Sequence, residues 1–154
     1  MTRVNFFGPV DSIFGAEIGI ADVLVIEALL LALVVLNFVT RKIAHDRHVA
    51  QADDGAETIA HFVPHEVTNG LLLVGSFYYM TIAATYHPGF ILSSLVIGLV
   101  LTDFFEFEAR KAEARRGVPL DRPKGALAAA AIVLAYAAYQ TLFFIIEGPV
   151  SAII

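Results

Sequence analysis

Long apolar stretches alternate with short polar segments along this chain, and that alternation predicts its architecture. Four of the stretches approach the roughly 20 residues that a helix needs to cross a bilayer core. A helix satisfies its own backbone hydrogen bonds there, and no barrel-strand periodicity is visible. The sequence therefore predicts an all-α membrane protein, an antiparallel bundle of four transmembrane helices forming a single domain over 1–154, with spans at about 21–40, 68–86, 90–107 and 126–146.

The segments between these spans predict how the helices are joined. Tyr86-His-Pro-Gly89 reads as a tight turn between the second and third spans, because Pro and Gly punctuate helices. The N-terminal segment 5–19 is apolar but too short to cross, so we expect it to lie at the membrane interface. The loops 41–67 and 108–125 are the polar ones, and the third helix should extend to about Arg116.

The distribution of Lys and Arg predicts the orientation. Nine of the ten basic residues follow the first span or lie between the third and fourth. The positive-inside rule places both clusters in the cytoplasm, so an even number of spans leaves both termini outside. We therefore expect a multi-pass protein of the cell membrane.

Composition agrees with this class and excludes others. Of 154 residues, 58% are hydrophobic and only 16% are charged, whereas a soluble domain is nearer half apolar. The absence of cysteine excludes disulfides and thiolate metal sites. The net charge of −5 provides no basic field for nucleic acid, so we expect no nucleic-acid partner.

Four phrases together resemble a known family. They are SFYY (76–79), TDFFEFEARKAEAR (102–115), RPKGA (122–126) and YAAYQTLFF (136–144). The chain resembles, over most of its length, an uncharacterised family of small four-helix integral membrane proteins from halophilic archaea. The resemblance implies no activity and no catalytic residues. It implies a salt-rich cytoplasm, with which the acidic segment 53–57 is consistent.

Polar residues at one depth of the predicted spans form a first candidate site. Glu27 lies 13 residues before Thr40, which places it ~20 Å from the inner boundary. Ionisable groups inside a span are costly, and they are functional candidates by default. One interpretation is a structural polar layer holding the helices together, and the other is a proton or cation site with Glu27 as the carrier. The layer comprises Glu27, Thr81, Ser94 with its neighbour Ser93, Tyr139 and Gln140.

Charged residues where the third span ends form a second candidate site. Asp103, Glu106 and Arg110 share one side of that helix. Short acidic side chains cannot reach far toward water, so these should point at protein, with Arg110 or with Arg41 and Lys42 of the first helix as partners. The row Ser94, Gly98 and Thr102 has the i+4 spacing of a close helix–helix seam, and it runs directly into this charged group.

Histidines on the same side raise the third possibility. His45 and His48 are three residues apart, and His61 and His65 are four apart. Such pairs can share a metal ion, with carboxylates completing the shell. The alternative is that these are loop histidines that titrate near neutral pH.

No complete catalytic constellation emerges, so the expected function is non-catalytic. We expect a small subunit or scaffold of a membrane assembly, whose partners are the lipid bilayer and other membrane subunits or itself. Transport through Glu27 is the first alternative. A membrane-anchored metal enzyme using the histidines is the second, and a metal ion is the only cofactor the sequence raises.

Overall fold

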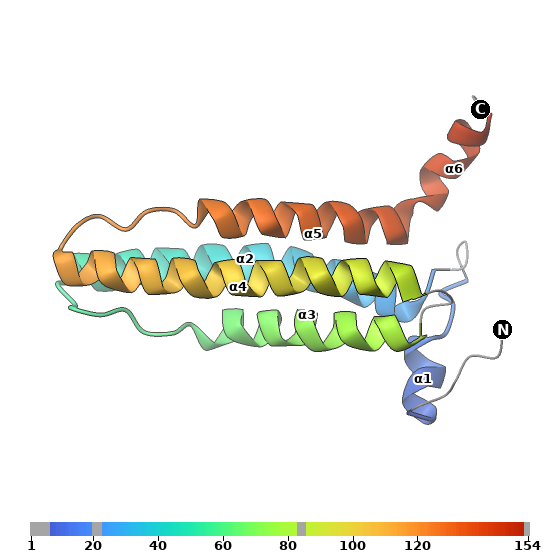
Figure 1. The fold of residues 1–154 in the computed structure, drawn as a ribbon, viewed down its shortest axis with the longest axis horizontal. Helices are drawn as coiled ribbons and strands as arrows, with labels where there is room; N and C mark the ends of the chain where they lie inside the picture. Colours follow the sequence, from blue (N-terminus) through green and yellow to red (C-terminus); the bar gives the residue numbers. More distant parts are fainter. Residues whose placement is uncertain (1–6, 20–22, 83–85, 153–154) are drawn as a thin grey trace.

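The computed structural model describes residues 7–19, 23–82 and 86–152, and this part of the chain is all α-helical apart from its connections and one isolated backbone bridge. Four long helices lie side by side and two short helices flank them at one end (Figure 1). The long helices are α2 (Val25–Asp53), α3 (Val63–Ile82), α4 (Tyr86–Arg116) and α5 (Lys124–Leu142), and the short ones are α1 (Pro9–Phe14) and α6 (Phe144–Ser151).

The long helices form an antiparallel bundle. Helix α4 packs between α3 and α5, and α2 completes the ring by packing on both α3 and α5. The loops 54–62 and 117–123 lie at one end of the bundle, which we call the loop end, and α1 and α6 lie at the other, which we call the terminal end (Figure 1). The predicted all-α bundle is therefore observed.

Glycines in the left-handed region end the helices at the loop end. Gly117 has φ +64°, and the amides of Gly117 and Val118 donate to the carbonyls of Ala114 and Glu113, at 3.0 and 3.2 Å. This is how a helix satisfies its last carbonyls when glycine follows it. Gly55, with φ +82°, follows α2 in the same way. Helices α2 and α4 therefore both run well beyond the apolar stretches predicted from hydropathy.

The segment Tyr86–Gly89, expected to be a turn, instead begins α4. Proline is tolerated in the first turn of a helix, where its missing amide proton would have no partner. Pro88 has this position in α4, as Pro64 does in α3. Residues 83–85, which connect the two helices, lie outside the described part of the chain, as do residues 5 and 6 of the expected interfacial segment.

The fourth predicted span, 126–146, is not one straight helix. Helix α5 ends at Leu142, and α6 begins at Phe144 and turns away from the bundle axis (Figure 1). Helix α1 also lies across the terminal end (Figure 1). The short helices at this end thus lie at an angle to the four long ones.

The interior of the bundle is aliphatic along most of its length. Side chains from all four long helices are fully buried there, including Leu30, Val34, Leu72, Leu99 and Val133. On α4 the buried positions recur every three or four residues, as expected for a helix with one face against its neighbours.

Large hydrophobic side chains also cover much of the outside. Examples on the long helices are Val35, Val74, Leu101 and Ile132, each between 51% and 68% exposed. Two helices, His87–Arg116 and Lys124–Leu142, are long and apolar enough to cross a membrane. Length and composition alone indicate a membrane location only weakly, because core helices of soluble proteins can meet the same test.

Candidate functional site

A buried ion pair joins α2 to α4 near the middle of both helices. The Nη1 atom of Arg41 donates to Oδ1 of Asp103, and the two side chains are only 3% and 9% exposed. Helical phase places both residues toward the bundle interior, as their burial shows. Separating two charges with so little access to water would leave each of them uncompensated.

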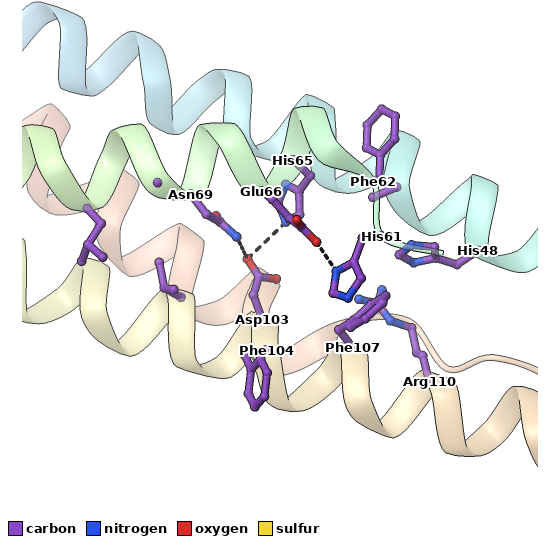
Figure 2. Close-up of a pocket in the computed structure, with 14 residues that line it drawn as sticks. His48, His61, Phe62, His65, Glu66, Asn69, Asp103, Phe104, Phe107 and Arg110 are labelled. Carbon is purple, nitrogen blue, oxygen red and sulfur yellow. Dashed lines mark hydrogen bonds and ion pairs between the residues drawn. The ribbon is translucent and has the colours of Figure 1, made fainter. Parts of the chain in front are cut away.

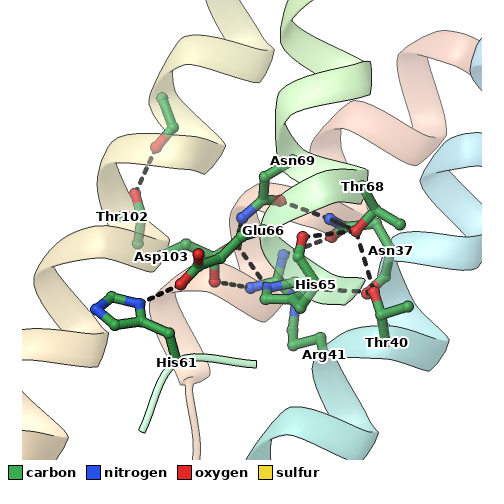
Figure 3. A network of polar contacts seen from close by, with 11 residues as sticks. Asn37, Thr40, Arg41, His61, His65, Glu66, Thr68, Asn69, Thr102 and Asp103 are labelled. Carbon is green, nitrogen blue, oxygen red and sulfur yellow. Dashed lines mark hydrogen bonds and ion pairs between the residues drawn. The ribbon is translucent and has the colours of Figure 1, made fainter. Parts of the chain in front are cut away.

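The second oxygen of Asp103 binds α3. Its Oδ2 atom accepts a hydrogen bond from Nδ2 of Asn69 at 3.0 Å and lies 3.2 Å from Nε2 of His65 (Figure 3). One carboxylate thus contacts three side chains from two other helices. Both of its oxygens are engaged, as a buried carboxylate requires.

Further polar side chains extend the contacts between α2 and α3. The Asn37 amide donates to Oδ1 of Asn69 at 2.6 Å, and its own Oδ1 accepts from Nη2 of Arg41 at 2.6 Å. The Thr40 hydroxyl lies 3.0 Å from Nδ1 of His65 and 3.1 Å from the hydroxyl of Thr68 (Figure 3). We call this set the buried polar cluster, and its members are Asn37, Thr40, Arg41, His65, Thr68, Asn69 and Asp103.

A cavity of about 370 Å³ lies beside the buried polar cluster, between α3 and α4. Asn69, His65 and Asp103 line it toward the middle of the bundle, and His48 and Arg110 line it toward the loop end (Figure 2). The lining therefore draws on two of the predicted sites. Asp103 and Arg110 belong to the predicted boundary group, and the predicted metal site contributes His48, His61 and His65.

The four histidines near the loop end have separate partners. His61 pairs with Glu66 and packs on the Phe107 ring with centroids 4.2 Å apart. Nε2 of His48 lies 3.1 Å from the carbonyl oxygen of Ala60. His65 belongs to the buried polar cluster, and His45 lines a different groove, beside Arg122. Within the described residues, no three histidine or acidic side chains converge as metal ligands.

Burial and nearby positive charge disfavour protonation of two of these histidines. Burial lowers the pKa of His48 to about 4, and the Arg110 charge acts in the same direction. The same two causes lower the pKa of His45, in the same order. Both imidazoles are therefore neutral at physiological pH.

The predicted boundary group is divided between three environments. Asp103 pairs with Arg41, whereas Lys42 binds Asp46 at the surface at 2.6 Å. Glu106 does not pair with Arg110, because its Oε1 atom accepts the backbone amide of Gly125 at the start of α5, at 2.7 Å. A carboxylate is favoured at a helix N-terminus, where free amides point outward. Arg110 is left facing the cavity.

The structure does not bring the five residues of the predicted polar layer together. Glu27 lies in the first turn of α2, where its Oε2 atom accepts the Leu24 amide at 2.9 Å and its Oε1 atom accepts the Tyr79 hydroxyl at 2.5 Å. The hydroxyls of Thr81 and Ser94 donate to carbonyls of their own helices. The remaining two lie on α5, where Gln140 binds Tyr136 and Tyr139 is 53% exposed.

Two of the three residues of the expected seam on α4 face outward, whereas Thr102 lies against the start of α5, where a Cβ added to Gly125 would be 3.2 Å from its Cγ2 atom. Ser94 and Gly98 are exposed, and a Cβ added to Gly98 would meet nothing within 4 Å. The close approach of α3 and α4 occurs instead at Gly89, where a Cβ would lie 2.3 Å from Cα of Met80. Spacing identifies a row of small residues but not the direction in which each of them points.

Sequence reasoning missed three members of these networks. Asn69 and Thr68 were not singled out, and Tyr79 was quoted without a role. The sequence does mark two of them. Asn69 is an amide next to a long apolar stretch, and Tyr79 is the last residue of SFYY (76–79), a polar aromatic residue within such a stretch. Only the packing of α3 against α2 shows which groups they bind.

The arrangement provides hydrogen bonding, ion pairing and a lined cavity. No curated protein and no solved structure matches the chain. A family model, described as a domain of unknown function, DUF7313, matches residues 2–154. The chain therefore belongs to this family of unknown function.

Proposed function

We propose that the protein is an integral membrane protein whose four long helices all cross the bilayer, and that it acts as a non-catalytic subunit or scaffold. One observation carries the proposal: large aliphatic side chains cover much of the outside of the bundle, while charged and amide side chains are buried inside it. Arg41, Asp103 and Asn37 are buried, whereas aliphatic side chains such as Val35 and Val74 are exposed. In water this distribution would expose apolar surface that soluble monomers avoid, and in lipid it is the favourable one.

The orientation that we propose puts the loop end in the cytoplasm. Nine of the ten Lys and Arg residues lie at or near that end, including Arg41, Arg110 and Lys124. The positive-inside rule then places both termini outside. Helix α4, with 31 residues, is longer than a bilayer core requires and would extend into the cytoplasm.

The scaffold role is supported by how the interior polar groups are used. The oxygens of Asp103 and Glu27 are occupied by partners on other helices or by capping, which fits a structural role better than proton carriage. The outward row of Ser94 and Gly98 offers a face where another membrane helix could approach closely. The partner we propose is a membrane subunit or a second copy of this chain.

Membrane topology can be tested directly because the chain contains no cysteine. Single cysteines at Val118, in the loop end, and at Phe7, at the terminal end, can be treated with a membrane-impermeant maleimide in intact cells. We expect labelling of Phe7→Cys only, and of both variants after permeabilisation. Labelling of both in intact cells, or a protein released by carbonate washing, would contradict four crossings.

The scaffold role needs a separate measurement. Native mass spectrometry after purification in a mild detergent should show a fixed partner subunit or a defined oligomer. Gly98→Ile should weaken that association, because it places a branched side chain on the outward row. Leu101→Ile, a volume-conserving change at another exposed position of α4, is the matched control. A monomer with no partner in native membranes would contradict the proposal.

A further inference from the structure

The cavity between α3 and α4 has two chemically different ends. Toward the loop end it is lined by Arg110 with His48 and His61 (Figure 2). Toward the middle of the bundle it is lined by Gly70, Leu73, Val100 and Phe104. A volume of about 370 Å³ lies within the range of small-molecule sites.

Arg110 is a buried cation that forms no ion pair with another residue of the described part of the chain. The residue is only 7% exposed, and its Nε atom has no hydrogen-bond partner. Burial opposes its charge so strongly that the pKa of its guanidinium is lowered. A buried charge of this kind is costly unless something compensates it.

The acidic groups nearby are already engaged elsewhere. Asp103 binds Arg41, Asn69 and His65, and Glu66 pairs with His61. On α4 itself, Glu106 accepts the Gly125 amide and Glu113 accepts the Asp121 amide. The second oxygen of Glu106 is buried without a partner, but it forms no ion pair with Arg110. Arg110 therefore has no direct ion-pair partner among the described residues, although the nearby charges of Asp103, Glu106 and Glu113 favour its charged form.

The imidazole of His48, whose pKa is lowered by burial, lies at the same end of the cavity. His48 is 3% exposed, and its Nδ1 atom is buried without a partner. An anion beside Arg110 would favour a proton on this nitrogen, which would then donate a second hydrogen bond. Guanidinium and imidazole groups together bind carboxylates and phosphates well.

The other end of the cavity suits a hydrocarbon chain. Leu73 and Val100 are partly buried there, and Phe104, 55% exposed, lies on the outer side of α4. Gly70 adds no side chain, and a Cβ at this position would meet nothing within 4 Å. The apolar end is thus open enough to accept a chain without displacing protein atoms.

We propose that this cavity binds a single-chain amphiphile with an anionic head, either a carboxylate or a phosphate. The head pairs with Arg110 beside His48, and the alkyl chain lies along Leu73, Val100 and Phe104. The site goes beyond the scaffold role and does not depend on it. Such a molecule could come from solution as a free acid or from the bilayer as a lipid with one chain, and both share the chemistry that the cavity recognises.

Binding can be measured on the full chain in lipid nanodiscs by native mass spectrometry and by the shift of the thermal unfolding midpoint. Dodecanoate added to the solution probes the free acid, and lysophosphatidic acid supplied in the nanodisc probes the lipid. We expect saturable binding of at least one of them, and which one binds identifies the source. Acetate and inorganic phosphate, which have the charge without the chain, should bind at least about tenfold more weakly.

Three variants assign the binding to the cavity. Arg110→Gln removes the cation and should weaken binding about tenfold or more, because a charge-assisted hydrogen bond is lost. Arg115→Gln removes an exposed charge from the same helix and should leave binding unchanged. Gly70→Leu fills the apolar end while keeping Arg110, so it should also weaken binding.

The proposal has clear contrary outcomes. Unchanged affinity in both Arg110→Gln and Gly70→Leu would place any binding outside the cavity. Equal binding of dodecyltrimethylammonium would show that the anionic head is not recognised, and equal binding of acetate or phosphate would show that the chain is not. These results are independent of topology and partner association, so the scaffold proposal can fail without this one.

Discussion

Arg41 of α2 and Asp103 of α4 form an ion pair in the interior of the bundle, with side chains only 3% and 9% exposed. The pair is 62 positions apart in the sequence and therefore fixes the rotation of two helices that no short loop connects. A buried pair contributes little when compared with a well-packed apolar pair, but breaking it leaves an uncompensated charge.

We expect Asp103→Asn to destabilise the folded bundle by about 3–5 kcal/mol, because it leaves Arg41 buried without its counter-charge. The change keeps the size of the side chain and removes only the charge. The free energy of unfolding can be measured by SDS titration in mixed micelles. Asp46→Asn, which removes an exposed partner of Lys42, is the control and should cause no measurable change. An equal effect of the two substitutions would contradict the central role of the buried pair.

Replacing both partners should be less damaging than replacing one. In Arg41→Met with Asp103→Leu, no unpaired charge remains, and apolar side chains of similar length occupy the space. We expect the double variant to be more stable than Asp103→Asn in the same titration. If the loss of unfolding free energy in the double variant equalled the sum of the losses in its two single substitutions, Arg41 and Asp103 would not be acting as a pair.

Much of the bundle could be predicted from the sequence because hydropathy and helical phase are local properties. The four apolar stretches each correspond to a long helix, and the phase of Asp103 on its helix directed attention to the end of the first one. Hydropathy alone does not give the length of α2. It continues to Asp53 through polar residues, because the cluster around Thr40, Arg41 and His48 buries that part of the helix.

The interior contacts were harder to predict because they depend on which face of each helix meets its neighbour. Equal distances along separate helices suggested that Glu27 and Ser94 share a layer, but Ser94 faces outward and its hydroxyl binds the Phe90 carbonyl. Hydroxyl groups can satisfy themselves within one helix, whereas an amide such as Asn37 cannot do so as easily. Residue type alone does not identify the helix contacts, because the Thr40 hydroxyl contacts His65 of α3 whereas the Gln140 amide binds Tyr136 of its own helix.

Gly89 should tolerate no side chain. A Cβ there would lie 2.3 Å from Cα of Met80, so α3 and α4 would have to separate. We expect Gly89→Ala to destabilise the bundle by about 2–3 kcal/mol, as overpacking does. Gly98→Ala on the same helix meets open space and should be neutral or stabilising by up to about 1 kcal/mol. Thermal unfolding of the two variants in one detergent gives the comparison, and similar midpoints would contradict the close approach.

The hydroxyl of Tyr79 should contribute to stability through Glu27. It donates to Oε1 of Glu27 at 2.5 Å, and the Tyr79 side chain is almost completely buried. Tyr79→Phe leaves that carboxylate oxygen without its partner, which should cost about 1–3 kcal/mol of unfolding free energy. Tyr139→Phe, at a position 53% exposed, should change it by less than about 0.5 kcal/mol. Equal effects of the two substitutions would show that the hydrogen bond does not stabilise the fold.

Stability should fall in mildly acidic solution because of His48. Burial, reinforced by Arg110, lowers its pKa in the folded state from 6.5 to about 4. Below pH 6.5 the unfolded chain therefore takes up a proton that the folded bundle refuses, so the contribution of His48 to stability declines from pH 6.5 toward pH 4, by up to about 3 kcal/mol. His48→Gln keeps an amide donor near the Ala60 carbonyl and should flatten the pH dependence of the unfolding free energy across this window. His87→Gln, at an exposed histidine, should leave the slope as it is. A slope that His48→Gln does not change would mean that this imidazole is protonated equally easily in the folded and unfolded chains.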